Sequence, residues 1–221
     1  MGRKSNAQKR TEKLYKKYGD VEVGVIPNNV LNDLSDFTPP QNAPRMKCDN
    51  KSCEFLYYIN HNFQMMPRYL AETDTEYRQI IPYTILRAKD EDGEAKYYVT
   101  KRIGGDNRLL DMYSLGIGGH LEDDNIYECL YRELKEETGL SSQDIWWKDF
   151  CGYIKMNKTE VDAVHIGLIF VLTVKNPAKV VVKEPESLEG QWMNYDEIIK
   201  LRSNKSMETW AEVVIDKVLR R

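Results

Sequence analysis

The sequence predicts an α/β protein in which helices cover both sides of a mixed β-sheet, with an extension at the N-terminus. Two groups of segments with the residue pattern of β-strands lie after residue 78. One amphipathic helical segment separates the two groups, and two further helical segments follow the second. Strands and helices in this order favour a layered fold with the sheet in the middle.

Length and composition fit one well-packed domain plus an appendage. The chain has 221 residues and a mass of 25.9 kDa, which is enough for one sizeable core. Hydrophobic residues make up 41% and charged residues 30%, so the chain has enough apolar surface to fold. The formal net charge of −3 gives no general attraction to nucleic acids or anionic lipids. Nucleic acid is therefore an unlikely partner, and no membrane association is expected.

Residues 1–20 form a basic N-terminal arm that we expect to be helical after Ser5. The arm carries seven basic side chains against two acidic ones. It could bind RNA or a partner, but charge runs at termini usually only face solvent, and we favour that interpretation. The N-terminal extension, residues 21–76, opens with a strand at 21–27 that stops at a proline and continues as a loop-rich stretch.

The main domain is expected at residues 77–221 and begins with a β-hairpin. Its strands are predicted at 79–88 and 95–103, and the Asp92–Gly93 pair between them is a strong turn signal. A short third strand at 112–117 leads into a glycine-rich loop.

A central helix is predicted at Ile126–Thr138, with Gly139 as its C-terminal cap. The remaining predicted elements are strands at 145–156 and 161–174, a short strand at Trp192, and helices near 196–202 and 207–219. These segments complete the second group of strands and the helices that follow it.

The central helix carries glutamates on the side that should face the core. The apolar arc of its helical wheel holds Ile126, Cys129, Leu130 and Leu134. Glu133 and Glu137 lie inside this arc, one turn apart, and Glu136 lies at its edge. A Glu-rich helix face is usually solvated, but here that reading fails, because unpaired carboxylates among apolar residues are costly to bury. A cation must therefore compensate them.

The residue types indicate which cation. Carboxylates one turn apart suit Mg²⁺ or Mn²⁺, hard ions that also coordinate phosphate oxygens. The glycines ahead of the helix, Gly116, Gly118 and Gly119, let the backbone approach a ligand closely, and a carbonyl there can join the coordination shell. The sequence therefore predicts a protein that binds a divalent metal and a diphosphate.

The stretch from Gly118 to Leu140 resembles the Nudix box, G-x5-E-x7-R-E-U-x-E-E-x-G-U, in which U is aliphatic. Eight of the nine defined positions match. Asp124 stands where the pattern has its first Glu; it keeps the charge but shortens the reach, which puts the role of that side chain in doubt. With the order of elements from 79 to 218, the resemblance covers about two thirds of the chain. It implies a Nudix-type α/β/α sandwich. The glycine-framed stretch SLGIGGHLED and the N-terminal addition resemble a little-characterised bacterial branch of predicted phosphoesterases.

The resemblance implies a hydrolase that uses Mg²⁺ or Mn²⁺ to cleave the pyrophosphate linkage of a nucleoside diphosphate derivative. Glu133, Glu136, Glu137 and the backbone of Gly118 would be the metal ligands. Glu136, Glu137 and Arg132 are the expected catalytic residues. Arg132 would orient Glu133 or another carboxylate through a forked salt bridge, and a plain surface arginine is its alternative role.

Substrate contacts are less clearly marked. His120 follows the glycines and could contact phosphate, although such a histidine more often orders its own loop. The acidic loop before Trp192 offers Glu184, Glu186 and Glu189 as substrate contacts or as the general base, and plain solvation is its alternative role. The resemblance also allows a general base from the central helix itself.

Three other functions stay open. A Nudix-fold sensor would bind a nucleotide without cleaving it, but a sensor has no need of the complete set of glutamates. An isopentenyl diphosphate isomerase would need a catalytic cysteine, and neither Cys129 nor Cys151 has a matching context. RNA decapping, with the basic arm holding the RNA, predicts salt-dependent RNA binding that is lost when residues 1–20 are deleted.

We expect the protein in the cytoplasm. The longest apolar run, Ile166–Val174, is about half the length needed to cross a bilayer, and the N-terminus has no apolar signal-peptide core. The four cysteines fit free thiols in a reducing compartment. Cys48 and Cys53 could contribute to a zinc site, but no second ligand pair follows them. A small nucleotide derivative is the expected partner, and a homodimer is allowed, because family members are often dimers.

Overall fold

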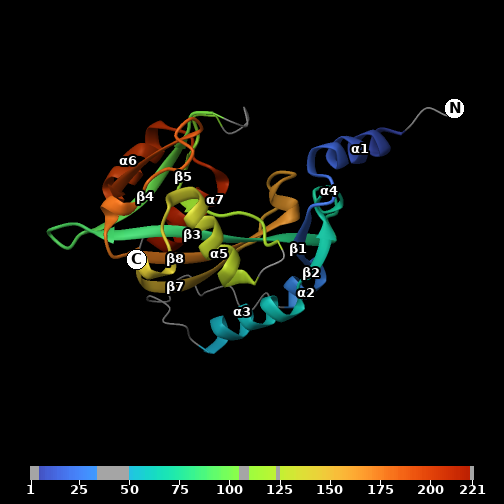
Figure 1. The fold of residues 1–221 in the computed structure, drawn as a ribbon, viewed down its shortest axis with the longest axis horizontal. Coiled ribbons are helices and arrows are strands. Elements are labelled where there is room, and N and C mark those ends of the chain that lie inside the picture. Colours follow the sequence, from blue (N-terminus) through green and yellow to red (C-terminus); the bar gives the residue numbers. More distant parts are fainter. Residues whose placement is uncertain (1–4, 34–49, 105–109, 123–124, 220–221) are drawn as a thin grey trace.

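A computed structural model of the chain describes residues 5–33, 50–104, 110–122 and 125–219 (Figure 1). Some positions that the sequence singles out lie outside these ranges: Asp124, Cys48 and the prolines at 39, 40 and 44. The side chain of Cys53 is also outside the described part, so the zinc-site hypothesis stays untested. Within the described ranges, no helix has both the length and the apolarity needed to cross a bilayer.

The fold is built on one nine-stranded sheet with β3 (Tyr77–Lys89) at its centre. β3 pairs antiparallel with β1 (Glu22–Pro27), β4 (Ala95–Arg102) and β6 (Gly116–Ile117), and parallel with β8 (His165–Val174). The other strands are β2 (Gln64–Pro67) beside β1, β7 (Ile145–Ile154) beside β8, and β5 (Tyr113–Ser114) and β9 (Leu188–Asn194) beside β4. One parallel pair among antiparallel pairs makes the sheet mixed, as predicted.

Helices cover both faces of the sheet (Figure 1). All ten residues of β8 are buried, because side chains that alternate in direction enter two different cores. Leu168 and Phe170 pack in the core that includes α5 (Ile126–Thr138) and α3 (Asn50–Asn62). Ile169 and Val171 pack in the core that includes α6 (Tyr195–Asn204), α7 (Thr209–Val214) and the π-helical turn Ile215–Leu219. The predicted α/β/α sandwich is confirmed.

The N-terminal extension is part of the same sheet, since β1 pairs with β3. α1 (Asn6–Tyr18) begins at its cap Ser5, as predicted, and projects from the body of the molecule beside α4 (Arg68–Ala71) (Figure 1). The loop-rich stretch expected after β1 contains α2 (Asn28–Asp33), α3, β2 and α4, which corrects that prediction. α3 is stable there because Phe55 and Ile59 enter the core beside α5. The domain division at residue 77 stays a prediction.

The strand predicted at 161–174 begins only at His165, which is a second correction. Residues Asp162–Val164 form a 3₁₀ turn instead. The Asp162 carboxylate accepts hydrogen bonds from the backbone N–H of Thr159 (3.1 Å) and from its hydroxyl (2.9 Å), and this local bonding competes with strand formation. The turn leaves Thr159, Val161 and Asp162 at the wall of a cavity described below.

Candidate active site

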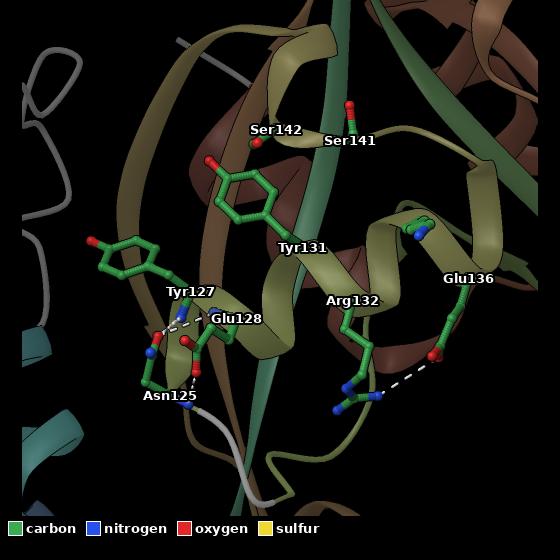
Figure 2. A pocket seen from close by; sticks show the side chains of 9 residues that line it. Asn125, Tyr127, Glu128, Tyr131, Arg132, Glu136, Ser141 and Ser142 are labelled. Carbon is green, nitrogen blue, oxygen red and sulfur yellow. Dashed lines mark hydrogen bonds and ion pairs between the residues drawn. The ribbon is translucent and has the colours of Figure 1, made fainter.

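α5 occupies the predicted residues because both of its ends are capped. Asn125 accepts hydrogen bonds from the backbone N–H groups of Tyr127 (3.0 Å) and Glu128 (3.1 Å), and the Glu128 carboxylate accepts one from the Asn125 N–H (3.2 Å) (Figure 2). Gly139 ends the helix in the left-handed conformation, with φ of 73°. These caps fix the residues at which α5 begins and ends.

The side of α5 that faces the sheet carries carboxylates. Its apolar residues Ile126, Cys129, Leu130 and Leu134 are buried, as the helical wheel predicts. The Glu133 side chain is only 14% exposed, whereas that of Glu136 is 60% exposed. Glu137 is half-buried and lines a cavity. Two of the three glutamates are therefore largely removed from water.

The glycine loop before α5 lies directly against these carboxylates. A Cβ atom on Gly119 would lie 2.2 Å from Glu133 Oε1, so a larger residue there would displace the carboxylate. A Cβ atom on Gly118 would lie 2.2 Å from the carbonyl oxygen of Pro82, in the neighbouring backbone of β3. Both glycines are thus required by close approach.

Arg132 ties Glu133 to this loop. Its Nη1 donates to Glu133 Oε1, and its Nη2 donates to the carbonyl oxygen of His120 at 3.0 Å. Nη1 also lies 3.6 Å from Glu136 Oε2, an ion pair that Figure 2 shows. The guanidinium group therefore fixes the position of one carboxylate relative to the glycine loop.

The two inward carboxylates are disfavoured as anions. Burial raises the pKa of Glu133, although the neighbouring Arg132 guanidinium opposes this shift. Burial raises the pKa of Glu137 to about 7, and the negative charge of Glu133 adds to the effect. A hydrogen bond from the Gly118 backbone and the positive charge of Arg102 act in the opposite direction. A bound cation would relieve this repulsion.

A cavity of about 530 Å³ opens beside Glu137 and Gly118, a size typical of small-molecule sites. Its apolar lining consists of Ile81, Tyr83, Met112, Val161, Leu188 and Trp210. Its hydroxyl-bearing lining consists of Thr100, Ser114, Thr159 and Thr209. Its remaining side chains with titratable or charged groups are Arg102, Glu137, Asp162, His165 and Glu208. We call this cavity the β3–α7 pocket.

The helix, the glycine loop and the pocket correspond to a known family. Residues 83–217 match the family model described as NUDIX domain. The chain belongs to the Nudix family. The match covers more than half of the chain and contains the whole of α5.

Individual relatives agree with this assignment. The curated protein YmaB of Bacillus subtilis (strain 168) is 32% identical over 178 residues, which are 76% of this chain and 84% of YmaB. The crystal structure of Tm1382, a candidate Nudix hydrolase, superposes with a TM-score of 0.68 at 26% identity and covers 90% of this chain and 98% of that one. At this coarse level the protein is a Nudix hydrolase.

A more distant structure shares the fold. The Nudix domain of Shewanella oneidensis NrtR, solved with ADP ribose, has a TM-score of 0.53 at 12% identity, and the match covers 70% of this chain and 96% of that one. The sandwich around the Nudix helix is thus common to proteins with little sequence in common.

The Nudix helix fits a Mg²⁺ or Mn²⁺ ion in its donor chemistry. Among the described residues, no group of three or more His, Cys, Asp or Glu side chains is arranged to hold a metal ion. Mg²⁺ in nucleotide enzymes, however, commonly takes one or two carboxylates and completes its shell with water and substrate phosphate. Glu133 and Glu137, both half-buried and with the charge of Glu133 raising the pKa of Glu137, match that requirement.

His120 of the Nudix loop faces His165 at the start of β8. The Nε2 atoms of the two rings lie 3.1 Å apart, and His165 Nδ1 lies 2.7 Å from the carbonyl oxygen of Val161. Burial lowers the pKa of His120 to about 2 and also lowers that of His165, so both rings are neutral. A carbonyl only accepts, so His165 carries its proton on Nδ1 and His120 donates from Nε2. The pair joins the glycine loop to the pocket wall.

The three glutamates of the acidic loop are all exposed, and the fold separates them. Glu184 follows Lys183, whose backbone N–H donates to the Glu137 carbonyl at 3.0 Å, and the charge of Glu184 contributes to the raised pKa of Glu137. Glu189 pairs with Lys101 across β9 and β4 and lines a different hollow. Of the three, Glu184 is the one that acts on Glu137, while Glu186 has no described contact with the Nudix helix.

A second hollow, of about 830 Å³, lies on the outward side of the Nudix helix (Figure 2). Tyr127, Tyr131 and Lys135 line it, with Arg132 and Glu136 at the same surface. Glu133 and Glu137 are not part of its lining. Because Glu137 lines the β3–α7 pocket instead, that pocket is the better candidate for the substrate.

Sequence reasoning missed several residues of the pocket. Arg102 lies one residue before the end of the strand predicted at 95–103, close to where sheet residues meet a loop, and this was the available signal. Glu208 and Trp210 lie more than a hundred residues further along, and nothing in their local sequence marks them. Only the fold brings them beside Glu137.

Proposed function

We propose that this Nudix protein is a divalent-metal-dependent hydrolase that cleaves the pyrophosphate linkage of a nucleoside diphosphate derivative. The observation that carries the proposal is the pair of inward carboxylates: Glu133 lies against the glycine loop, and Glu137 lines a cavity. Burial disfavours both carboxylates as anions; the Arg132 guanidinium partly compensates Glu133, and a bound cation would compensate the pair.

The charge of the pocket supports a metal requirement. Its lining has three acidic side chains, Glu137, Asp162 and Glu208, against one permanent cation, Arg102, and His165 is neutral. A diphosphate brings further negative charge into this field. Binding of such a substrate therefore needs a cation that the described side chains do not supply.

Each residue of the site has a proposed role. A bound Mg²⁺ or Mn²⁺ would neutralise phosphate oxygens and lower the pKa of a water molecule. Glu133 and Glu137 would hold the ion, with Glu136 and the Gly118 carbonyl as further ligands, and Arg132 keeps Glu133 in place.

The lining of the pocket supports the proposal that the substrate carries a nucleoside-sized group. Its hydroxyl groups can bond a sugar, and Tyr83 and Trp210 offer apolar surface. Glu184 is our candidate for the group that accepts a proton from the attacking water, because its charge is close enough to Glu137 to raise the pKa of that residue.

A substrate panel tests the proposal. Purified protein is incubated with Mg²⁺ or Mn²⁺ and with ADP-ribose, NADH, coenzyme A, dinucleoside polyphosphates and oxidised nucleoside triphosphates, and phosphate-containing products are measured. Glu137→Gln should lose at least about a hundredfold in rate, the scale of removing one electrostatic stabiliser. The matched control is Glu91→Gln, the same change in the exposed turn between β3 and β4, which should keep full activity.

Three outcomes contradict the proposal. Equal turnover by wild type and Glu137→Gln refutes the ligand assignment. Full activity in the presence of a chelator refutes the metal requirement. Tight nucleotide binding without turnover of any compound favours the sensor.

A further inference from the structure

The β3–α7 pocket contains an ion pair that the proposed function leaves unused. Arg102 Nε donates to Glu208 Oε1 at 3.1 Å, and the pair joins the end of β4 to the residue that precedes α7. The Arg102 side chain is 37% exposed and that of Glu208 is 19% exposed. Both residues line the pocket, and the Arg102 side chain is the more exposed of the two.

The backbone holds Arg102 firmly in place. Its N–H donates to the carbonyl of Met112 at 3.0 Å, its carbonyl accepts from Asp111 at 2.9 Å, and it pairs with Leu188 of β9. A fixed backbone and one fixed Nε bond orient the planar guanidinium before any ligand arrives. Such preorganisation reduces the entropy lost on binding.

Arg102 is also the one permanent cation among the described residues that line the pocket. Of the pocket acids, Asp162 is already bonded by Thr159 and lies 3.3 Å from the Thr209 hydroxyl. Glu208 has Arg102 as its partner. A guanidinium group has five N–H donors in a fork that matches phosphate, and the bond to Glu208 uses one of them.

We propose that Arg102 binds a phosphate group of the substrate, and that Glu208 orients the guanidinium in the empty pocket and gives way when the phosphate arrives. This inference rests on the proposed function and adds the anchor for the phosphate that the Nudix glutamates do not hold. The substrate class it defines is a diphosphate with one phosphate at the Nudix helix and the other at Arg102, followed by a nucleoside-sized group in the remaining pocket.

A purely structural ion pair is the alternative explanation. An ion pair at this degree of exposure contributes little to stability, and in that role both partners would matter equally. A phosphate anchor with a competing carboxylate behaves differently, because the two substitutions then have opposite effects on substrate affinity. The sign of the Glu208 effect therefore separates the two explanations.

The experiment compares Arg102→Ala, Arg102→Lys and Glu208→Gln. Arg102→Ala should raise KM about ten- to hundredfold, the range for losing a charged hydrogen bond, with a smaller change in kcat. Arg102→Lys should recover part of the affinity, because it restores the charge but not the fork. Glu208→Gln should lower KM two- to tenfold, because the competing negative charge is gone. Lys101→Ala is the matched control, since Lys101 is the adjacent residue and pairs with Asp111 outside the pocket.

A binding measurement makes the result independent of turnover. Calorimetric titration with ADP and Mg²⁺ should show the same order of affinity: Glu208→Gln tightest, then wild type, Arg102→Lys and Arg102→Ala. Thermal unfolding checks that each variant is folded. If Arg102→Ala does not fold, the affinities of Arg102→Lys and Glu208→Gln test whether Arg102 binds phosphate. The inference is overturned when Glu208→Gln weakens binding as Arg102→Ala does, or when neither changes it. If the ADP affinities follow the expected order but no compound is hydrolysed, the proposed function is wrong and the role of Arg102 in binding phosphate stands.

Discussion

At Glu137, the stability of the fold favours the protonated side chain, whereas the proposed binding of a metal ion needs the charged carboxylate. Burial raises its pKa to about 7, well above the unfolded value of about 4.3. The folded, metal-free protein therefore holds a proton on Glu137 more tightly than the unfolded chain does. The stability gained from this proton is fully present below about pH 4.3 and is lost as the pH rises through about 7.

This residue gives a prediction on pH and metal. At pH 8 with chelator, Glu137→Gln should be more stable than wild type, on the order of 2 kcal/mol, because a neutral amide replaces a buried anion. The difference should shrink at pH 5, where wild type is protonated. Mg²⁺ should reduce the difference at pH 8, because an ion that binds the folded state stabilises wild type more. Urea unfolding at both pH values measures this, and a larger difference at pH 5 than at pH 8 would contradict it.

The neighbouring glycines Gly118 and Gly119 give a second prediction: the same substitution by alanine should affect stability at one position and activity at the other. Gly119→Ala should retain the fold but lose activity, by roughly ten- to hundredfold, because the new methyl group displaces the carboxylate of Glu133, a movable side chain. Gly118→Ala should instead lower the melting temperature, because the methyl group meets the backbone carbonyl of Pro82, which cannot move away alone. Activity assays and thermal unfolding of both variants test the contrast. Identical losses of stability would show that Gly119 has only a packing role.

At the scale of elements, a single arginine positions a wall of the pocket. Arg78 of β3 is 2% exposed. Its Nη1 donates to the carbonyls of Met156 (2.7 Å) and Asp162 (2.6 Å), and its Nε donates to Asn28 (3.0 Å). Asn157 accepts from Nη2. The segment between β7 and β8, which supplies Thr159, Val161 and Asp162 to the pocket, is thus bonded to the centre of the sheet.

We therefore expect Arg78→Lys to destabilise the protein by about 2–4 kcal/mol, because an ammonium group cannot satisfy all these buried acceptors at once. KM should rise as well, since the pocket wall is no longer fixed. Arg87→Lys is the control: Arg87 is on the same strand but bonds mainly Thr173 and Asp149 at a more exposed site, and its loss should stay near 1 kcal/mol. Equal midpoints in urea unfolding would show that the segment does not depend on Arg78.

The elements differ in how far the sequence determines them. α5 is predicted to the residue because its limits are local: Asn125 and Glu128 form one cap and Gly139 the other. β2 and α4 were missed because four-residue elements leave almost no periodic pattern, and β2 exists through its pairing with β1. Strand formation of this kind depends on partners that are distant in the sequence.

At the scale of the molecule, the two halves of the candidate site differ in the same way. The carboxylates of the Nudix helix depend on local sequence, whereas the pocket lining depends on residues that are distant in the sequence. The inward direction of Glu133 and Glu137 follows from helical periodicity and is confirmed. Arg102, Glu208 and Trp210 meet only because β4, the start of α7 and the Nudix helix surround one cavity. The inward carboxylates of the Nudix helix were therefore predictable from sequence, whereas the lining of the pocket required the fold.

The whole-molecule arrangement also decides what the basic arm can do. On α1, the basic residues Lys9, Arg10, Lys13, Lys16 and Lys17 fall on one side of the helix and are exposed. The other side faces α4, where Tyr15 meets Tyr69 edge-on at 5.2 Å and Tyr18 lies against Arg68. Arg10 reaches Glu160, at the outside of the pocket wall, with 2.8 Å between the charged atoms. None of the described residues of α1 lines the pocket.

Deletion of residues 1–19 should therefore leave turnover of small nucleotides within about twofold of wild type, because an exposed ion pair such as Arg10–Glu160 contributes little. Thermal unfolding should change only slightly, since α1 packs mainly on α4 (Figure 1). The control is Arg10→Ala in the full chain, which removes the ion pair and keeps the helix. A tenfold loss of kcat/KM in both variants would show that the arm acts on the pocket wall through Glu160. Salt-dependent RNA binding that is present in the full chain and absent from the deletion would instead revive the decapping hypothesis, because releasing counterions is the signature of phosphate contacts.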